Sequence, residues 1–125
     1  MGLYASGEDY LEAILMIGKK QGVIRSVDIA RHMGVSKPSV CHAVTILRKS
    51  GFLTMDEERY IHLTKKGQEI AEKIYERHCF FREQLMAAGI DKATAEKDAC
   101  RLEHAISEES FKKLKESMKI SKRTV

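Results

Sequence analysis

The sequence predicts a mainly α-helical protein with one small β-hairpin. Apolar residues recur at three- and four-residue spacing over most of the chain, which indicates amphipathic helices, and they alternate with polar residues in two short runs between residues 52 and 63. Hydrophobic residues make up 43% and charged residues 32% of the 125 residues, a balance typical of a chain that buries a core. No apolar run approaches the roughly 18 residues of a membrane span and no signal-peptide pattern begins the chain, so we expect a cytoplasmic protein.

Two helices are predicted first, the second of them short, and each is bounded by residues that favour a helix end. Ser6 and Asp9 resemble a capping box and begin the first helix, which Gly22 ends. Ser26 is expected to cap the second helix, over residues 27–33. The inward positions of that helix and of the turn after it are Val27, Ile29, Ala30, Met33 and Val35.

The third helix is the most clearly marked. Ser36 caps it, Pro38 stands in its first turn, where a missing N–H costs nothing, and Gly51 ends it. The alternating runs 52–55 and 60–63 surround four polar residues and predict a β-hairpin. The order helix, helix, turn, helix, hairpin is that of a winged helix-turn-helix.

Three further helices are predicted after the hairpin. A long one runs from the cap Thr64 to about residue 88. The next begins at Asp91 and reaches about residue 106, and Ser107 caps the last. Their inward positions are Ile70, Ile74, Phe81, Leu85, Ala95, Ala99, Leu102, Ile106, Phe111, Leu114 and Met118.

The last helix carries more apolar surface than one small chain must cover. We therefore expect its stripe of Phe111, Leu114 and Met118 to join two copies of the chain, and its basic tail from Lys119 to fray. The chain then divides into residues 1–71, the winged helix-turn-helix, and residues 72–125, a helical dimerisation domain.

The third helix has the surface of a DNA reader. Its outward side chains are hydroxyls, an imidazole and ammonium groups, and no carboxylate occurs between residues 35 and 51. The net charge of +4 permits nucleic-acid binding, although a winged helix used for protein contact is the alternative. The candidate contacts are Ser36, Lys37, Ser39, His42, Thr45 and Lys49, with Arg59 from the otherwise acidic hairpin.

A second group of residues has the chemistry of a metal site. Cys100, Glu103 and His104 share one helix face, and thiolate, carboxylate and imidazole are ligands for divalent first-row metals. If the helices pack together, further ligands converge and one or two ions can be held. The additional candidates are Asp9, Glu12 and His78. Each of these three residues also has a simpler interpretation. Asp9 can be a helix cap, Glu12 a solvated helix acid and His78 a buried histidine.

Five segments occur in a recognisable order: 8–12 (EDYLE), 36–40 (SKPSV), 63–67 (LTKKG), 77–78 (RH) and 99–107, which contains ACRLEH. As an ordered set they resemble the diphtheria toxin repressor family, most closely its short two-domain manganese-sensing branch. The resemblance implies a homodimeric repressor of metal-uptake genes, activated by Fe²⁺ or Mn²⁺, for which Zn²⁺ or Co²⁺ can substitute. It further implies the metal ligands Asp9, Glu12, His78, Cys100, Glu103 and His104, and DNA contacts from Ser36, Pro38, Ser39 and His42.

The chain departs from the family pattern at three places. The short branch usually has a carboxylate where Cys100 stands, whereas the iron-sensing branch has cysteine there, so the metal is left open. Arg82 stands where the family commonly has a Glu ligand, so a second ion would lose a ligand or use Glu83 or Glu96. We also expect the chain to lack the SH3-like third domain of longer members and the final helix of shorter ones.

Two other classes of function use the same residues. A repressor controlled by oxidation of Cys41, Cys79 or Cys100 would lack a nearby resolving cysteine. A metalloenzyme with Glu103 or Glu12 as general base would lack an HExxH motif or a Gly-rich phosphate loop. We therefore expect a regulator of double-stranded operator DNA rather than an enzyme.

Overall fold

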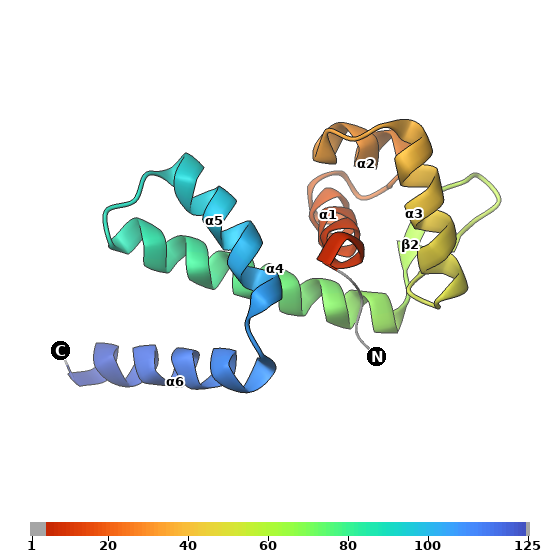
Figure 1. Ribbon diagram of the computed structural model, residues 1–125. Helices are drawn as coiled ribbons and strands as arrows, with labels where there is room; N and C mark the ends of the chain where they lie inside the picture. Colours follow the sequence, from red (N-terminus) through yellow and green to blue (C-terminus); the bar gives the residue numbers. More distant parts are fainter. Residues whose placement is uncertain (1–4, 125) are drawn as a thin grey trace. The chain divides into compact units, whose positions relative to one another are not determined.

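The computed structural model describes residues 5–124, and side chains for residues 5–118. Over this range it has six helices and one antiparallel hairpin (Figure 1), which confirms the predicted fold class and element order. The elements are α1 (Ala5–Gln21), α2 (Ser26–Met33), α3 (Lys37–Lys49), β1 (Leu53–Met55), β2 (Ile61–Leu63), α4 (Lys65–Ala87), α5 (Lys92–Ala105) and α6 (Glu108–Thr124). No helix of this part of the chain is long and apolar enough to cross a membrane.

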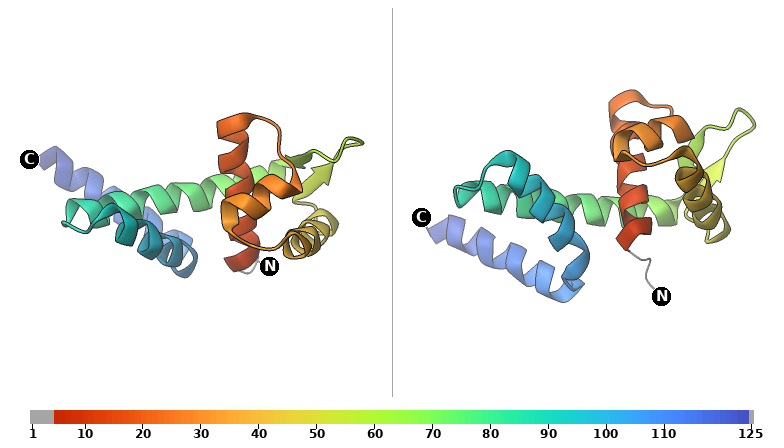
Figure 2. Two further views of the ribbon diagram at one scale, coloured as in Figure 1. Left: turned by 90° about the horizontal axis from the view of Figure 1, so that it is seen from above. Right: turned by 45° about the horizontal axis from the view of Figure 1, so that its top comes forward.

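The chain forms two compact units, residues 1–75 and 76–125, and α4 contributes residues to both. In the first unit, α2 and α3 pack on α1, and the hairpin follows α3 (Figure 2). The core of this unit is contiguous, and its fully buried members are Leu11, Ile14, Ile29, Val40 and Ala71. The hairpin pairs Leu53 with Leu63 and Met55 with Ile61.

Four of the predicted helix caps are confirmed by hydrogen bonds from the first turn. The accepting side chains are Ser36 (3.3 Å from Ser39 N), Thr64 (3.1 Å from Gly67 N), Asp91 (3.1 Å from Thr94 N) and Ser107 (3.1 Å from Ser110 N). Each oxygen satisfies a backbone N–H that has no partner within the helix. These caps therefore fix where α3, α4, α5 and α6 begin.

Two other predicted caps are wrong. Ser6 lies inside α1 and Ser26 is the first residue of α2, so neither precedes its helix. The residue before α2 is Arg25, whose backbone N–H donates to the Asp28 carboxylate at 3.0 Å. The acidic side chain in the third helical position thus satisfies the N–H of the residue before the helix, which is one half of a capping box.

Four apolar residues predicted to point inward are exposed. Val27 is 45%, Val35 37%, Leu102 40% and Leu114 42% exposed. Val27 lies about 200° around α2 from the buried Ile29, so the two cannot share a face. On α5 the buried face instead contains Ala95, Ala99 and Glu103, which turns Leu102 outward. Helix α6 extends to Thr124, and the predicted fraying after Lys119 stays a prediction.

The contact between α4 and the start of the hairpin predicts a strict requirement for glycine. A Cβ at Gly67 would overlap the carbonyl oxygen of Phe52. Gly67→Ala is expected to lower the free energy of unfolding by about 1–3 kcal/mol, measured by chemical denaturation, despite the helical preference for alanine. In the control Gly18→Ala, the Cβ would lie 3.3 Å from the flexible tip of Ile24, and stability should be unchanged or higher. Equal stability of the two variants would contradict this packing.

Candidate functional site

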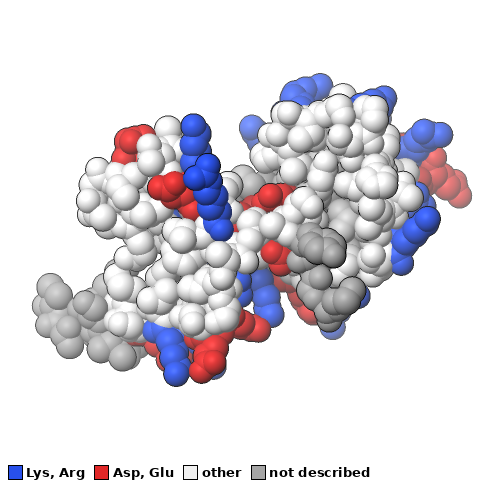
Figure 3. All heavy atoms as spheres, viewed as in Figure 1, with Lys and Arg blue, Asp and Glu red and all other residues white. Residues whose placement is uncertain are grey.

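Alpha helix 3 presents a polar and basic surface. Lys37, Pro38, Ser39, His42 and Lys49 are all exposed, as the sequence predicts. The Ser36 hydroxyl is partly engaged, because it caps α3 and lies 2.8 Å from the Ser39 hydroxyl. Lys and Arg side chains surround the edge of this unit in Figure 3. The exposed face therefore has the hydrogen-bonding groups and charge that contact nucleic acid.

The hairpin uses its first acidic residue to build its own turn. Asp56 accepts hydrogen bonds from the backbone N–H groups of Glu58 and Tyr60, both at 2.9 Å, and its other oxygen lies 2.9 Å from Nε2 of His62. Hydrogen bonding to His62 and to the backbone lowers the pKa of Asp56. Arg59 is exposed at the turn in the left-handed region, with φ 66°. The turn thus leaves Arg59 as the basic group at the tip.

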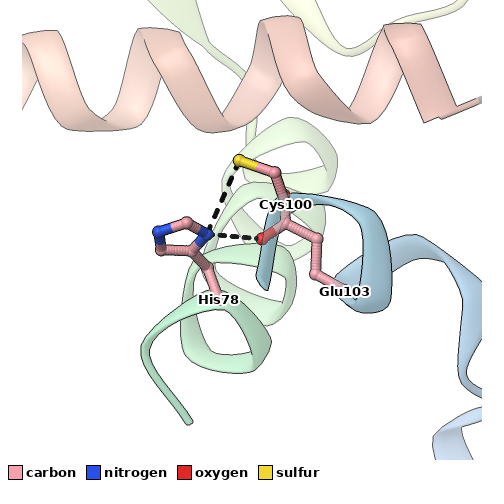
Figure 4. Close-up of side chains that lie close together, drawn as sticks. All are labelled: His78, Cys100 and Glu103. Carbon is pink, nitrogen blue, oxygen red and sulfur yellow. Dashed lines mark hydrogen bonds and ion pairs between the residues drawn. The ribbon is translucent and has the colours of Figure 1, made fainter. Parts of the chain in front are cut away.

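A cluster of possible metal ligands lies within the second unit (Figure 4). His78 projects from α4, and Cys100 and Glu103 project toward it from one face of α5. The Nδ1 atom of His78 is 3.0 Å from Oε2 of Glu103 and 3.8 Å from the Cys100 sulfur. An imidazole, a thiol and a carboxylate therefore present their donor atoms to one point.

Burial gives this cluster an unusual charge balance. Glu103 has 0% exposure, and hydrogen bonds to Cys100 and Glu103 raise the pKa of His78 to about 11. Among the described residues, Oε1 of Glu103 accepts no hydrogen bond, although Nε2 of His104 is 3.3 Å away. A buried carboxylate oxygen without a donor is costly, and a cation at the cluster would satisfy it. The donor set and this oxygen together fit a divalent transition metal.

Two arginines and a second carboxylate hold the cluster in place. Nε2 of His78 is 2.7 Å from Glu96, whose other oxygen is 3.2 Å from Arg82. Partial burial opposes ionisation of Glu96, but hydrogen bonds from His78 and Arg82 outweigh it and lower the pKa. Arg77 donates to the carbonyl oxygens of Glu103, at 3.2 Å, and Ile106, at 2.8 Å.

The predicted metal ligands fall in both units. The structure brings His78, Cys100 and Glu103 together in the second unit, with His104 beside Glu103. Asp9 and Glu12 lie one turn apart on α1 in the first unit, half-buried and buried respectively. The role of Arg77 as a donor to backbone carbonyl oxygens of the second unit was not predicted from the sequence. Its position next to His78 was the one signal that could have indicated it.

Comparison with known protein families finds one match to the N-terminal part of the chain and one to the C-terminal part. A family described as iron dependent repressor, N-terminal DNA binding domain, matches residues 2–67. One described as iron dependent repressor, metal binding and dimerisation domain, matches residues 64–123. The chain belongs to the iron-dependent repressor family. The predicted resemblance to diphtheria toxin repressor relatives is thereby confirmed.

Individual relatives agree with this family. The transcriptional regulator MntR of Escherichia coli O6:H1 is 34% identical over 83% of this chain and 67% of its own length. The HTH-type transcriptional regulator MntR of Shouchella clausii is 36% identical over 82% of this chain and 71% of its own. The structure of the manganese regulator SloR is 30% identical, with a TM-score of 0.79. The match covers 90% of this chain but about half, 53%, of that structure.

From the hydrogen bonds of Arg77 we expect this side chain to stabilise the C-terminal end of α5. Arg77→Ala removes charged hydrogen bonds to two carbonyl oxygens and is expected to destabilise the second unit by about 1.5–3 kcal/mol. Hydrogen exchange of α5 and α6 amides would measure the loss locally. The exposed Arg101 offers a control, because Arg101→Ala removes the same charge from the surface of α5. Equal protection in both variants would contradict the assigned role.

Proposed function

We propose that this protein is a metal-dependent transcriptional repressor. In this proposal it works in the cytoplasm and, loaded with Fe²⁺ or Mn²⁺, binds double-stranded operator DNA of metal-uptake genes as a homodimer. The observation that carries the proposal is the cluster of buried His78 and Glu103 with exposed Cys100. It lies in the segment that matches the family's metal-binding and dimerisation domain, after a segment that matches its DNA-binding domain.

The proposed ligand set combines donors from both parts of the chain. His78, Cys100, Glu103 and His104 supply imidazole, thiolate and carboxylate groups, and Asp9 and Glu12 supply hard carboxylate oxygens. Residues 1–71 then form the DNA-binding domain and residues 72–125 the metal-binding and dimerisation domain. Zn²⁺ and Co²⁺ suit the same donors and are proposed as substitutes.

The proposed DNA contacts lie on α3 and at the hairpin turn. They are Ser36, Lys37, Pro38, Ser39, His42, Lys49 and Arg59. All of these side chains are exposed, and they lie away from the buried face of α3, which supports the assignment. Lysines and arginines neutralise phosphates, whereas Ser39 and His42 have the donors and acceptors that read base edges.

The exposed apolar residues of the second unit support dimerisation. Leu102 on α5 is 40% exposed and Leu114 on α6 is 42% exposed. Phe111, by contrast, is buried against Phe80, with ring centroids 5.3 Å apart. The proposed dimer surface is therefore centred on Leu114 rather than on the whole predicted stripe.

The metal would act by shifting the equilibrium between conformations of the dimer towards the one that can bind DNA. Ligands from both units tie the DNA-binding part to the dimerisation part, and two recognition helices must meet half-sites about 34 Å apart. An ion favours repression only if it binds the DNA-competent arrangement more tightly than the others.

A titration of operator-containing DNA with metal-free protein tests the proposal. Fe²⁺, Mn²⁺, Zn²⁺ and Co²⁺ are added separately, and binding is followed by fluorescence anisotropy. We expect tight binding only with metal, from a dimer detected by sedimentation. DNA binding that is equally tight with a chelator present would overturn the metal-dependent function, and a metal-loaded monomer would overturn the homodimer.

Lys37 provides a test of the proposed recognition helix. Lys37→Ala removes one phosphate contact, so affinity should fall at every DNA sequence and the salt slope should shrink by about one unit. Anisotropy titrations at several salt concentrations measure both quantities. Lys97→Ala, which removes an exposed lysine from α5, is the control. An unchanged salt slope for Lys37→Ala would show that α3 does not contact the backbone at this position.

Cys100 provides a test of the proposed sulfur ligand. Co²⁺ bound to the parent should give a thiolate charge-transfer band in the near ultraviolet that is absent in Cys100→Ala. Cys100→Glu should keep metal binding but move the preference from Fe²⁺ towards Mn²⁺, because the donor set becomes harder. Cys79→Ala controls for loss of a cysteine elsewhere in the unit. Identical Co²⁺ spectra with and without the Cys100 thiol would remove it from the ligand set.

A further inference from the structure

The two ring nitrogens of His78 face different surroundings. Nδ1 faces Glu103 and Cys100, whereas Nε2 faces Glu96, which Arg82 holds from its other side. We infer that Glu96 and Arg82 are positioning residues: they direct Nδ1 of His78 to the metal and keep the Nε2 side free of any ion. The inference rests on the proposed metal site and adds how that site is oriented and limited.

Glu96 fixes the orientation of the imidazole. Its Oε2 is 2.7 Å from Nε2, so that nitrogen keeps its proton and donates it to the carboxylate. A metal would then displace the other ring proton, the one on Nδ1, and bind on the side of the Cys100 sulfur and the Glu103 carboxylate. A carboxylate behind a ligating histidine also makes the imidazole a better donor and holds the ring in place.

Arg82 places a positive charge beside the carboxylate that a second cation would need. Its Nη1 is 3.2 Å from Oε1 of Glu96, so both oxygens of this carboxylate already have positively polarised partners. A guanidinium does not lose its proton in proteins. An ion bound to Glu96 and Nε2 would therefore lie a few ångströms from a permanent positive charge, in a partly buried place where screening is weak.

The neighbouring carboxylate on α4 does not replace Glu96. Glu83 is exposed and stands five residues after His78, which places it about 140° around the helix. Phe81, one turn after His78, offers no donor atom. Among the described residues of this unit, the groups beside Nε2 are thus the Glu96 carboxylate and the Arg82 guanidinium. These two form an ion pair and not a site for a second ion.

The orientation is tested on the Zn²⁺-loaded parent, which needs no substitution. Long-range ¹H–¹⁵N spectra of the His78 ring should show zinc on Nδ1 and a proton on Nε2. In Glu96→Gln the charged acceptor is lost, the Nε2 proton should exchange faster, and Zn²⁺ affinity should fall about 10- to 100-fold. Glu96→Asp, which keeps the charge, should recover part of that affinity, a rescue that a purely structural role would not produce.

The exclusion of an ion is tested by reversing the charge of Arg82. Equilibrium dialysis with Zn²⁺ and metal analysis should give one more ion per chain for Arg82→Glu than for the parent. Lys97→Glu makes the same charge change at an exposed position of α5 and should leave the ratio unchanged. Zinc on Nε2 of His78, or no extra ion in a folded Arg82→Glu variant, overturns the inference while the proposed function stands. A parent that binds no Zn²⁺, Fe²⁺ or Mn²⁺ overturns both.

Discussion

A carboxylate without any exposed surface dictates the arrangement of the second unit. Glu103 is fully buried, and an isolated buried charge costs several kcal/mol, so its neighbours must offset it. His78 does so through a 3.0 Å contact, and hydrogen bonds to Cys100 and Glu103 raise the pKa of its ring to about 11. Glu96 balances the far side of that ring, and Arg82 balances Glu96. Charge alternates along this chain of contacts from the interior to the surface.

The apolar packing of the second unit comes from side chains outside the polar cluster. The buried residues of α5 are Ala95, Ala99 and Glu103, so this face contributes little apolar area. The larger hydrophobic contacts come from Phe80, Phe81 and Phe111, with the rings of Phe80 and Phe111 edge to face at 5.3 Å. The aromatic rings therefore supply the larger apolar contacts, whereas the ligand geometry depends on the polar cluster, whose buried ion pair also contributes to folding.

Local signals in the sequence predicted the fold well and the polar cluster only in part. Helix periodicity and the caps at Ser36, Thr64 and Asp91 are short-range effects, so they could be recognised without tertiary contacts. The inward placement of Leu102 failed because hydrophobicity alone ranks leucine above a glutamate on the same helix. The reason that Glu103 is buried, its match with His78 from another helix, is a tertiary contact that spacing cannot reveal.

The contact between His78 and Glu103 also limits how tightly an ion can bind at this cluster. An ion that uses Nδ1 of His78 and Oε2 of Glu103 must first separate two atoms that already interact at 3.0 Å. Part of its binding free energy replaces that interaction, so affinity is lower than for ligands held apart and ready. The Cys100 sulfur, 3.8 Å from the same Nδ1, and Oε1 of Glu103, 3.3 Å from Nε2 of His104, also have partners, but at longer distances. For a proposed sensor this balance is useful, because an ion that must replace an existing ion pair is held less tightly and can leave when its concentration falls.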